Sequence, residues 1–143
     1  MKPDTLFSLS NGLAMIGWLL LIALPLQRAN KIVFGIVITI LAAIYTWLVF
    51  EEFKPGNLQN FRSLEGVAAL FGNRKMLLAG WVHYLAFDLL AGVWIRNNAQ
   101  KLHVHYGFVI PCLVFTFLLG PMGLLIYLVI RTLLKRRYFT ENF

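Results

Sequence analysis

Three acid and base side chains, Asp88, His83 and Glu65, are the candidate catalytic groups of this chain. Asp88 stands about midway along the apolar stretch Met76–Ile95, where a carboxylate costs roughly 3 kcal/mol in a membrane helix. A carboxyl group in such surroundings is more stable when protonated, which suits a proton donor. The structural alternative is that Asp88 hydrogen-bonds to a neighbouring helix and that His83 is a satisfied interhelical side chain.

Helical spacing relates Asp88 to its neighbours. Tyr84 and Gly92 each lie four residues from Asp88, so all three share one helix face. Tyr84 could hydrogen-bond to Asp88, and Gly92 would let another helix approach closely. His83 lies five residues from Asp88, about 140° around the helix. The two therefore do not stack, although both could border one wide pocket, over which Glu65 could reach back.

Polar side chains at similar depth on the other apolar stretches predict a pocket that opens toward the cytoplasmic leaflet. The high aromatic content, 15% of the chain, suits a flat apolar ligand such as a polyene or an isoprenoid, although packing is its other use. The candidate ligand-contacting residues are Asn11, Glu51, Trp81, Tyr84 and Tyr127.

The elements that position these residues follow from the composition. Hydrophobic residues make up 59% of the 143 residues and charged residues 13%, against roughly 45–50% and 25% in soluble domains. This excess excludes a soluble enzyme. The net charge of +7 lies mainly near the ends of long apolar runs, which is typical of membrane proteins and not of nucleic-acid binding.

Four apolar stretches reach the roughly 20 residues that a membrane-spanning helix needs. They lack the alternating pattern of barrel strands. We therefore predict an all-α membrane protein, a single domain over residues 1–143 with four transmembrane helices. The predicted helices are Thr5–Gln27, Ile32–Phe50, Met76–Ile95 and Tyr106–Ile130.

The connectors and one interruption add detail. Arg28–Lys31 reads as a tight turn, and Glu51–Lys75 contains a short amphipathic helix that stops near Gly72-Asn73. Its apolar residues are Phe61, Leu64, Ala68 and Phe71. In the fourth stretch, Pro121 lacks an N–H group and predicts a kink in a continuous helix.

Four spans place both termini on the same side of the membrane. Nine Lys and Arg residues fall on that side and four on the other, so the positive-inside rule predicts that both termini are cytoplasmic. The nine are Lys2, Lys54, Arg62, Arg74, Lys75, Arg131, Lys135, Arg136 and Arg137. Arg96 and Arg131 end their predicted helices and are expected to extend to lipid head groups.

Cysteine and histidine usage predicts no metal site. Cys112 is the only cysteine and has apolar neighbours, so it is expected to be a small buried side chain. His103 and His105 form an isolated pair in a connector, without carboxylate or cysteine partners nearby.

Four stretches resemble the abscisic-acid-deficient-four-like family, which includes plastid proteins needed for neoxanthin formation and many bacterial proteins. They read GWVHYLAFDL at 80–89, PCL at 111–113, LLGPMGLLIY at 118–127 and SLEGV at 63–67. The resemblance runs from about Phe7 to Arg131. The family pattern often has an acidic residue after the Trp94-Ile95 pair, where this chain has Asn97-Asn98.

The resemblance implies an isomerisation in which an epoxide opens and a neighbouring double bond becomes an allene. This needs an acid and a base but no redox cofactor. Asp88 is then assigned as the acid and His83 as the base, with Glu65 as a third candidate. Because the chain begins almost at its first apolar stretch, without a transit peptide, we expect a bacterial inner membrane protein. The substrate would be a carotenoid, another isoprenoid lipid or a quinone.

Two hypotheses of different classes follow. The first is a cofactor-independent intramembrane isomerase that acts on a carotenoid or isoprenoid lipid. The second is a non-catalytic membrane protein that binds lipid or pigment or supports a partner complex. Membrane lipid is the expected partner in both, an oligomer is left open, and nucleic acid is not expected.

Overall fold

The computed structural model describes residues 2–24 and 27–135, and every regular element in these ranges is helical. Most elements are α-helices, whereas η1 is a π-helix and η2 is a 3-10 helix. The elements are α1 Pro3–Ala23, α2 Gln27–Ile32, η1 Val33–Ile38, α3 Thr39–Glu52, η2 Pro55–Arg62, α4 Leu64–Phe71, α5 Arg74–Lys101, α6 Tyr106–Leu119 and α7 Pro121–Lys135. The all-α prediction is confirmed for the described residues.

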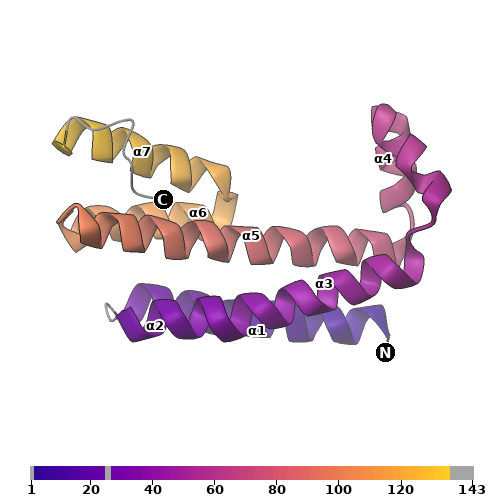
Figure 1. The fold of residues 1–143 in the computed structure, drawn as a ribbon, viewed down its shortest axis with the longest axis horizontal. Helices are drawn as coiled ribbons and strands as arrows, with labels where there is room; N and C mark the ends of the chain where they lie inside the picture. Colours follow the sequence, from indigo (N-terminus) through magenta and orange to yellow (C-terminus); the bar gives the residue numbers. More distant parts are fainter. Residues whose placement is uncertain (1, 25–26, 136–143) are drawn as a thin grey trace.

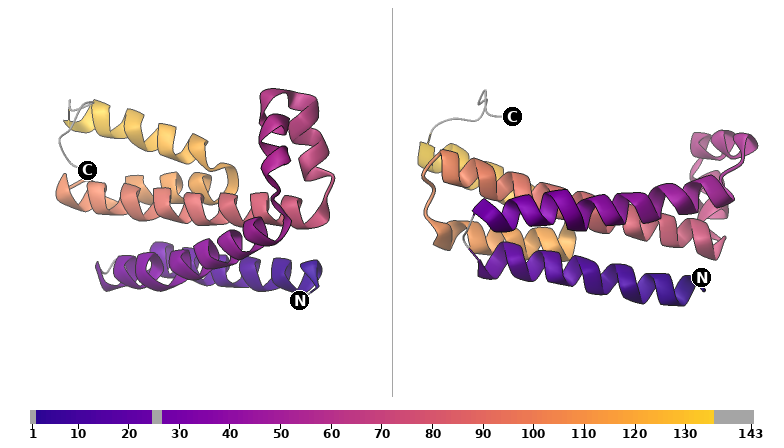
Figure 2. Two further views of the ribbon diagram at one scale, coloured as in Figure 1. Left: turned by 45° about the vertical axis from the view of Figure 1, so that its right-hand side comes forward. Right: turned by 60° about the horizontal axis from the view of Figure 1, so that its bottom comes forward.

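The long helix α5 lies at the centre of the bundle (Figure 1). Helix α1 and the run α2–η1–α3 pack along one side of it. Helices α6 and α7 pack along its C-terminal half, where α6 also contacts α1 (Figures 1 and 2). Gly92 allows the close approach of α1, because an added Cβ would lie 2.8 Å from the ring of Trp18. The predicted role of Gly92 in helix packing is therefore confirmed.

Three helical runs are long and apolar enough to cross a membrane: α1, Arg28–Glu52 and α5. Their outward faces carry exposed apolar side chains, such as those of Leu19 and Phe50. A bilayer would cover such faces, so the chain is a membrane protein. Arg28–Lys31 is helical and not the predicted turn, because it contains no glycine or proline to stop a helix.

The end of α5 differs from the prediction, because the helix continues past Ile95 to Lys101. Arg96 is fully buried, and its guanidinium donates to the carbonyl oxygens of Leu21, at 2.8 Å, and Leu24. The last carbonyls of a helix have no partner within the helix, so Arg96 caps the C-terminal end of α1. The expectation that Arg96 extends to head groups is wrong.

Arg131 is also buried, with 4% of its surface exposed. Its guanidinium donates to Asn98 Oδ1 at 3.2 Å and lies over the ring of Trp94. The expectation that Arg131 extends to head groups is wrong as well, because α7 packs this side chain against α5.

The fourth predicted helix is divided into two in the structure. Helix α6 ends at Leu119, and α7 begins at Pro121 and returns alongside α6 (Figures 1 and 2). Gly120 between them has φ +50°, a conformation that glycine adopts without steric cost. Pro121 then stands at the first position of α7, where its missing N–H is harmless. A reversal therefore replaces the predicted kink.

The α6–α7 hairpin does not cross the bundle from end to end. With 14 residues, α6 is about 21 Å long, whereas the hydrocarbon core of a bilayer is about 30 Å thick. The two helices meet at Gly123, where an added Cβ would lie 2.1 Å from the backbone nitrogen of Thr116. Such small residues let the backbones of membrane helices touch.

The reversal changes the expected distribution of charge. It brings the end of α7, with Arg131 and Lys135, beside the C-terminal end of α5 and Lys101 (Figure 1). The predicted nine-to-four excess of basic residues on one side then no longer holds. The cytoplasmic location of both termini loses this support and stays a prediction, and residues 136–143 lie outside the described part of the chain.

The amphipathic helix predicted between the second and third spans is present as α4. Ser63 caps its start by accepting a hydrogen bond from Gly66 N at 3.0 Å, and Gly72 ends it. Asn73 then caps α5 through its side-chain oxygen, which accepts from the backbone nitrogens of Lys75 and Met76. The predicted stop at Gly72-Asn73 is confirmed, although Phe61 belongs to η2.

Replacing Gly123 by alanine should separate α6 from α7 and lower the free energy of unfolding by about 1–3 kcal/mol, because the new methyl group overlaps the α6 backbone. Gly12→Ala is the matched control, since nothing lies within 4 Å of its added Cβ. It should leave stability unchanged or raise it by up to about 1 kcal/mol. Unfolding in mixed micelles measures the free energy of unfolding of each variant. Equal stability of Gly123→Ala and Gly12→Ala would contradict the contact between α6 and α7 at Gly123.

Candidate functional site

Asp88 lies at the middle of α5 and faces the break between α6 and α7. Only 7% of its surface is exposed. An added Cβ at Gly120 would lie 2.6 Å from Asp88 Oδ1, so the carboxyl group packs directly on the backbone of the break. A contact of Asp88 with a neighbouring helix was the predicted structural alternative, and the structure shows this contact at Gly120, where the chain reverses.

The second carboxyl oxygen of Asp88 is the unusual atom of this site. Asp88 Oδ2 is buried and has no hydrogen-bond partner among the described residues. Nearly all buried polar atoms in proteins are paired, because leaving one unpaired costs free energy. Asp88 Oδ2 is therefore a buried carboxyl oxygen for which the described residues supply no hydrogen bond.

Tyr84 lies one turn before Asp88 and meets the same break. Its hydroxyl donates to the carbonyl of Leu118 at 3.4 Å and is close enough to interact with the Asp88 carboxyl. The last carbonyls of α6 have no partner within α6, and inside a bilayer water does not supply one. Tyr84 and Asp88 are thus the polar side chains that α5 presents to the tip of the hairpin.

A row of contacts extends from this tip to α1. Trp81 packs against Tyr84, with ring centroids 5.5 Å apart, and its Nε1–H donates to Asn11 Oδ1 at 2.9 Å. We call Asn11, Trp81, Tyr84 and Asp88 the polar row. Three candidate ligand-contacting residues thus lie together with Asp88. A cleft of about 220 Å³ adjoins the row at Trp81, between the N-terminal ends of α1 and α5.

His83 lies on a different side of α5 from the polar row. Its ring stacks on Phe87, with centroids 4.5 Å apart, and contacts Tyr45 of α3 at 5.3 Å. It lines a cleft of about 390 Å³ between α3, α4 and α5. The structure therefore does not bring the predicted acid, Asp88, and the predicted base, His83, together. This agrees with their separation of about 140° around the helix.

The other candidate residues lie away from the polar row. Glu65 is exposed on the first turn of α4. Glu51 pairs with Lys75 Nζ at 2.6 Å, where α3 ends and α5 begins. Tyr127 is fully buried, and its hydroxyl donates to Asn98 Oδ1 at 2.7 Å. Its predicted depth assumed a crossing helix, whereas α7 turns back and places Tyr127 toward the C-terminal end of α5.

The sequence did not predict the burial of a set of polar residues in and around the last turns of α5. The one available signal was that residues 96–101 contain no glycine or proline, so the helix could continue and bury them. They are Asn30, Arg96, Asn98 and Arg131, and the exposed Asn97 is hydrogen-bonded to Asn30.

Cys112 and His105 have structural roles in and around α6. Cys112 is buried, as predicted. His105 caps α6, because its Nδ1 accepts a hydrogen bond from Gly107 N at 3.2 Å. Among residues 2–24 and 27–135, no three His, Cys, Asp or Glu side chains form a group that could hold a metal ion.

The contact between Asp88 and Gly120 predicts energetic coupling. Gly120→Ala should destabilise the protein, because the added methyl group overlaps the carboxyl group and the backbone has positive φ. Asp88→Ala removes the overlap, so the double variant should be more stable than the sum of the single effects predicts, by about 0.5–3 kcal/mol. Unfolding of all four proteins measures the coupling, and additive effects would show that the two residues do not touch.

The comparisons with known proteins agree with the sequence motifs that lie in this site. No curated protein and no solved structure matches the chain. A match to the family described as ABA DEFICIENT 4-like covers residues 5–127, which include the whole polar row and the tip of the hairpin. The chain therefore belongs to the ABA DEFICIENT 4-like family.

Proposed function

We propose that the protein binds a carotenoid- or isoprenoid-like lipid within a bacterial inner membrane and isomerises it by acid–base chemistry at Asp88. The observation that carries this proposal is the unpaired Oδ2 of a buried carboxyl group at the tip of the hairpin. Family membership supports a membrane protein related to neoxanthin formation, and hence a carotenoid-related ligand.

The reaction can be written with one carboxyl group. Protonated Asp88 gives its proton to an epoxide oxygen as the carbon–oxygen bond breaks. The resulting carboxylate takes the proton of the neighbouring vinylic carbon, whose C–H electron pair becomes the second double bond of an allene. The substrate gains and loses one proton, so the step is an isomerisation. Since His83 and Glu65 lie apart from Asp88, the carboxylate of Asp88 acts as the base.

The polar row offers a path for such a ligand. Trp81 is 41% exposed and lies two turns from Asp88, about 10 Å along α5. An apolar chain that occupies the cleft beside Trp81 would pass Tyr84 before it reaches Asp88. Aromatic faces at this spacing suit a flat conjugated chain, and the Tyr84 hydroxyl could orient an oxygen on the ligand.

A second candidate function is binding of lipid or pigment, or support of a partner complex, without catalysis. It is favoured by the tight packing of Asp88 Oδ1 on Gly120, which gives the carboxyl group a structural task at the hairpin tip. In this case Asp88 would hold the hairpin on α5, and the ligand would leave the protein unchanged.

Pigment conversion separates the two functions. Cells that make an epoxidised carotenoid would express the wild type, Asp88→Asn or Glu52→Gln. The last is a control with the same chemical change at a half-buried ion pair with Lys75, outside the polar row. The wild type and Glu52→Gln should convert the pigment, whereas Asp88→Asn should convert it at least about 100-fold more slowly. Membrane levels and melting temperatures show that each variant is folded.

Equal conversion by Asp88→Asn and the wild type would reject Asp88 as the acid. Pigment that copurifies with both proteins but is never altered would favour the non-catalytic function instead.

A further inference from the structure

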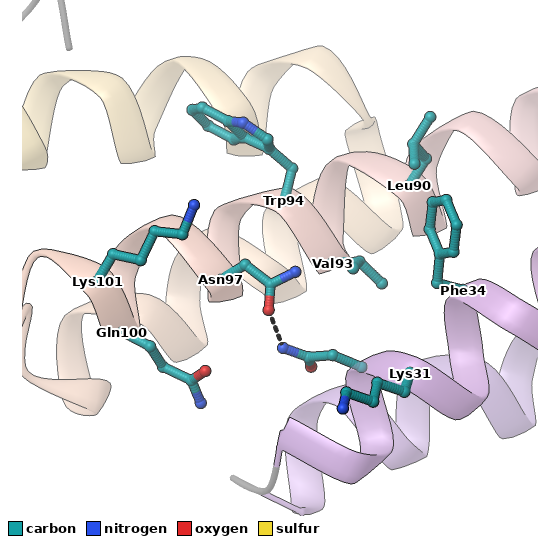
Figure 3. Close-up of a pocket in the computed structure, with 9 residues that line it drawn as sticks. Lys31, Phe34, Leu90, Val93, Trp94, Asn97, Gln100 and Lys101 are labelled. Atoms are coloured by element: carbon teal, nitrogen blue, oxygen red, sulfur yellow. Dashed lines mark hydrogen bonds between the residues drawn. The ribbon is translucent and has the colours of Figure 1, made fainter. Parts of the chain in front are cut away.

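A cleft of about 630 Å³ lies between the α2–η1 segment and the C-terminal half of α5 (Figure 3). One part of its wall is apolar, formed by Phe34, Leu90, Val93 and Trp94. The other part carries three amides and two amines: Asn30, Lys31, Asn97, Gln100 and Lys101. We call these nine residues the amide–lysine cleft. An apolar wall joined to a polar one matches a ligand that has both a chain and a headgroup.

The polar end of the amide–lysine cleft is positively charged. Lys31 and Lys101 both line it, on either side of Asn97 in Figure 3, and none of the nine lining residues is acidic. Neither lysine forms an ion pair with another described residue. Lys101 ends α5 and Lys31 lies in the first turns of the second membrane-length helix, so both stand at the level of lipid head groups.

A buried amide adds a second, independent observation. Only 4% of the Asn30 surface is exposed, and its Nδ2 donates to Asn97 Oδ1. Asn30 Oδ1 is buried and has no hydrogen-bond partner among the described residues. A buried acceptor left unpaired costs free energy, which a hydroxyl group on a bound headgroup would recover.

The backbone beside the cleft is also unusual. The π-helix η1 runs from Val33 to Ile38 and contributes Phe34 to the apolar wall. π-helical turns are rare and occur frequently at functional sites. In the same turns, Val33 and Val37 are buried in the core, and Val37 packs on Gly17 of α1. The π-helix thus packs against α1 through these valines, and Phe34 lines the cleft.

We infer that the amide–lysine cleft binds one anionic phospholipid. The phosphate lies between Lys31 and Lys101, a headgroup hydroxyl donates to Asn30 Oδ1, and an acyl chain follows the wall formed by Phe34 and Leu90. The three amides then contribute neutral hydrogen bonds. This site is independent of the proposed isomerisation, because Asp88 is not among its lining residues.

Native mass spectrometry of the detergent-purified protein tests this inference with phosphatidylglycerol and, as the uncharged probe, phosphatidylcholine. The wild type should retain one phosphatidylglycerol in preference to phosphatidylcholine. Each lysine near an anionic head group raises the affinity about fivefold. The double variant Lys31→Gln/Lys101→Gln should therefore bind phosphatidylglycerol about 25-fold more weakly. Lys54→Gln, a control outside the cleft, should change the affinity by less than about twofold.

A second variant tests the apolar wall at unchanged charge. Leu90→Trp should weaken the binding of both lipids, because the larger side chain fills the cleft. Equal affinity of the wild type for the two lipids, or equal losses in the lysine variants and in Lys54→Gln, would overturn the inference. Displacement of phosphatidylglycerol by millimolar inorganic phosphate would show a free-anion site and would overturn it as well.

Discussion

A helix break inside a membrane must find partners for its backbone, and this requirement organises the structure around Asp88. Gly120 reverses the chain between α6 and α7, beside the midpoint of α5. The bilayer supplies no water at that depth, so protein groups must satisfy the exposed carbonyls. Tyr84 donates to one of them, and the Asp88 carboxyl packs on Gly120. The same arrangement leaves Asp88 Oδ2 buried without a hydrogen-bond partner among the described residues.

Helix α5 carries polar side chains on several of its sides, and each of these sides packs against a different element. One side presents Asp88 to the hairpin tip, and another side presents His83 to α3 and α4. The last turns bury Arg96 against the carbonyls that end α1, and Asn98 accepts hydrogen bonds from α7. Buried polar groups in a membrane protein need such partners, since water is absent. A 28-residue helix supplies them at several depths at once.

Much of this architecture could be predicted from the sequence, and the failures have physical causes. Apolar length and helical period identify three spans, and the lone carboxylate in an apolar stretch identifies Asp88. Spacing alone separates His83 from Asp88 around the helix. However, a Gly-Pro pair is compatible with either a kink or a reversal, because the outcome depends on whether α6 and α7 pack on each other at Gly123. The burial of Arg96 could not be predicted for a related reason. Its partners are the carbonyl groups at the end of α1, and the sequence does not show that α1 packs beside it.

The distance between the two outer ends of the hairpin tests the central claim most directly. Spin labels at Phe108→Cys and Leu133→Cys, in a Cys112→Ala background and in liposomes, would report it, since both side chains are exposed. Packed antiparallel helices have axes about 8–10 Å apart, so the hairpin predicts a label separation below about 25 Å. One continuous helix would separate the two positions by about 37 Å, and a distribution centred there would contradict the account.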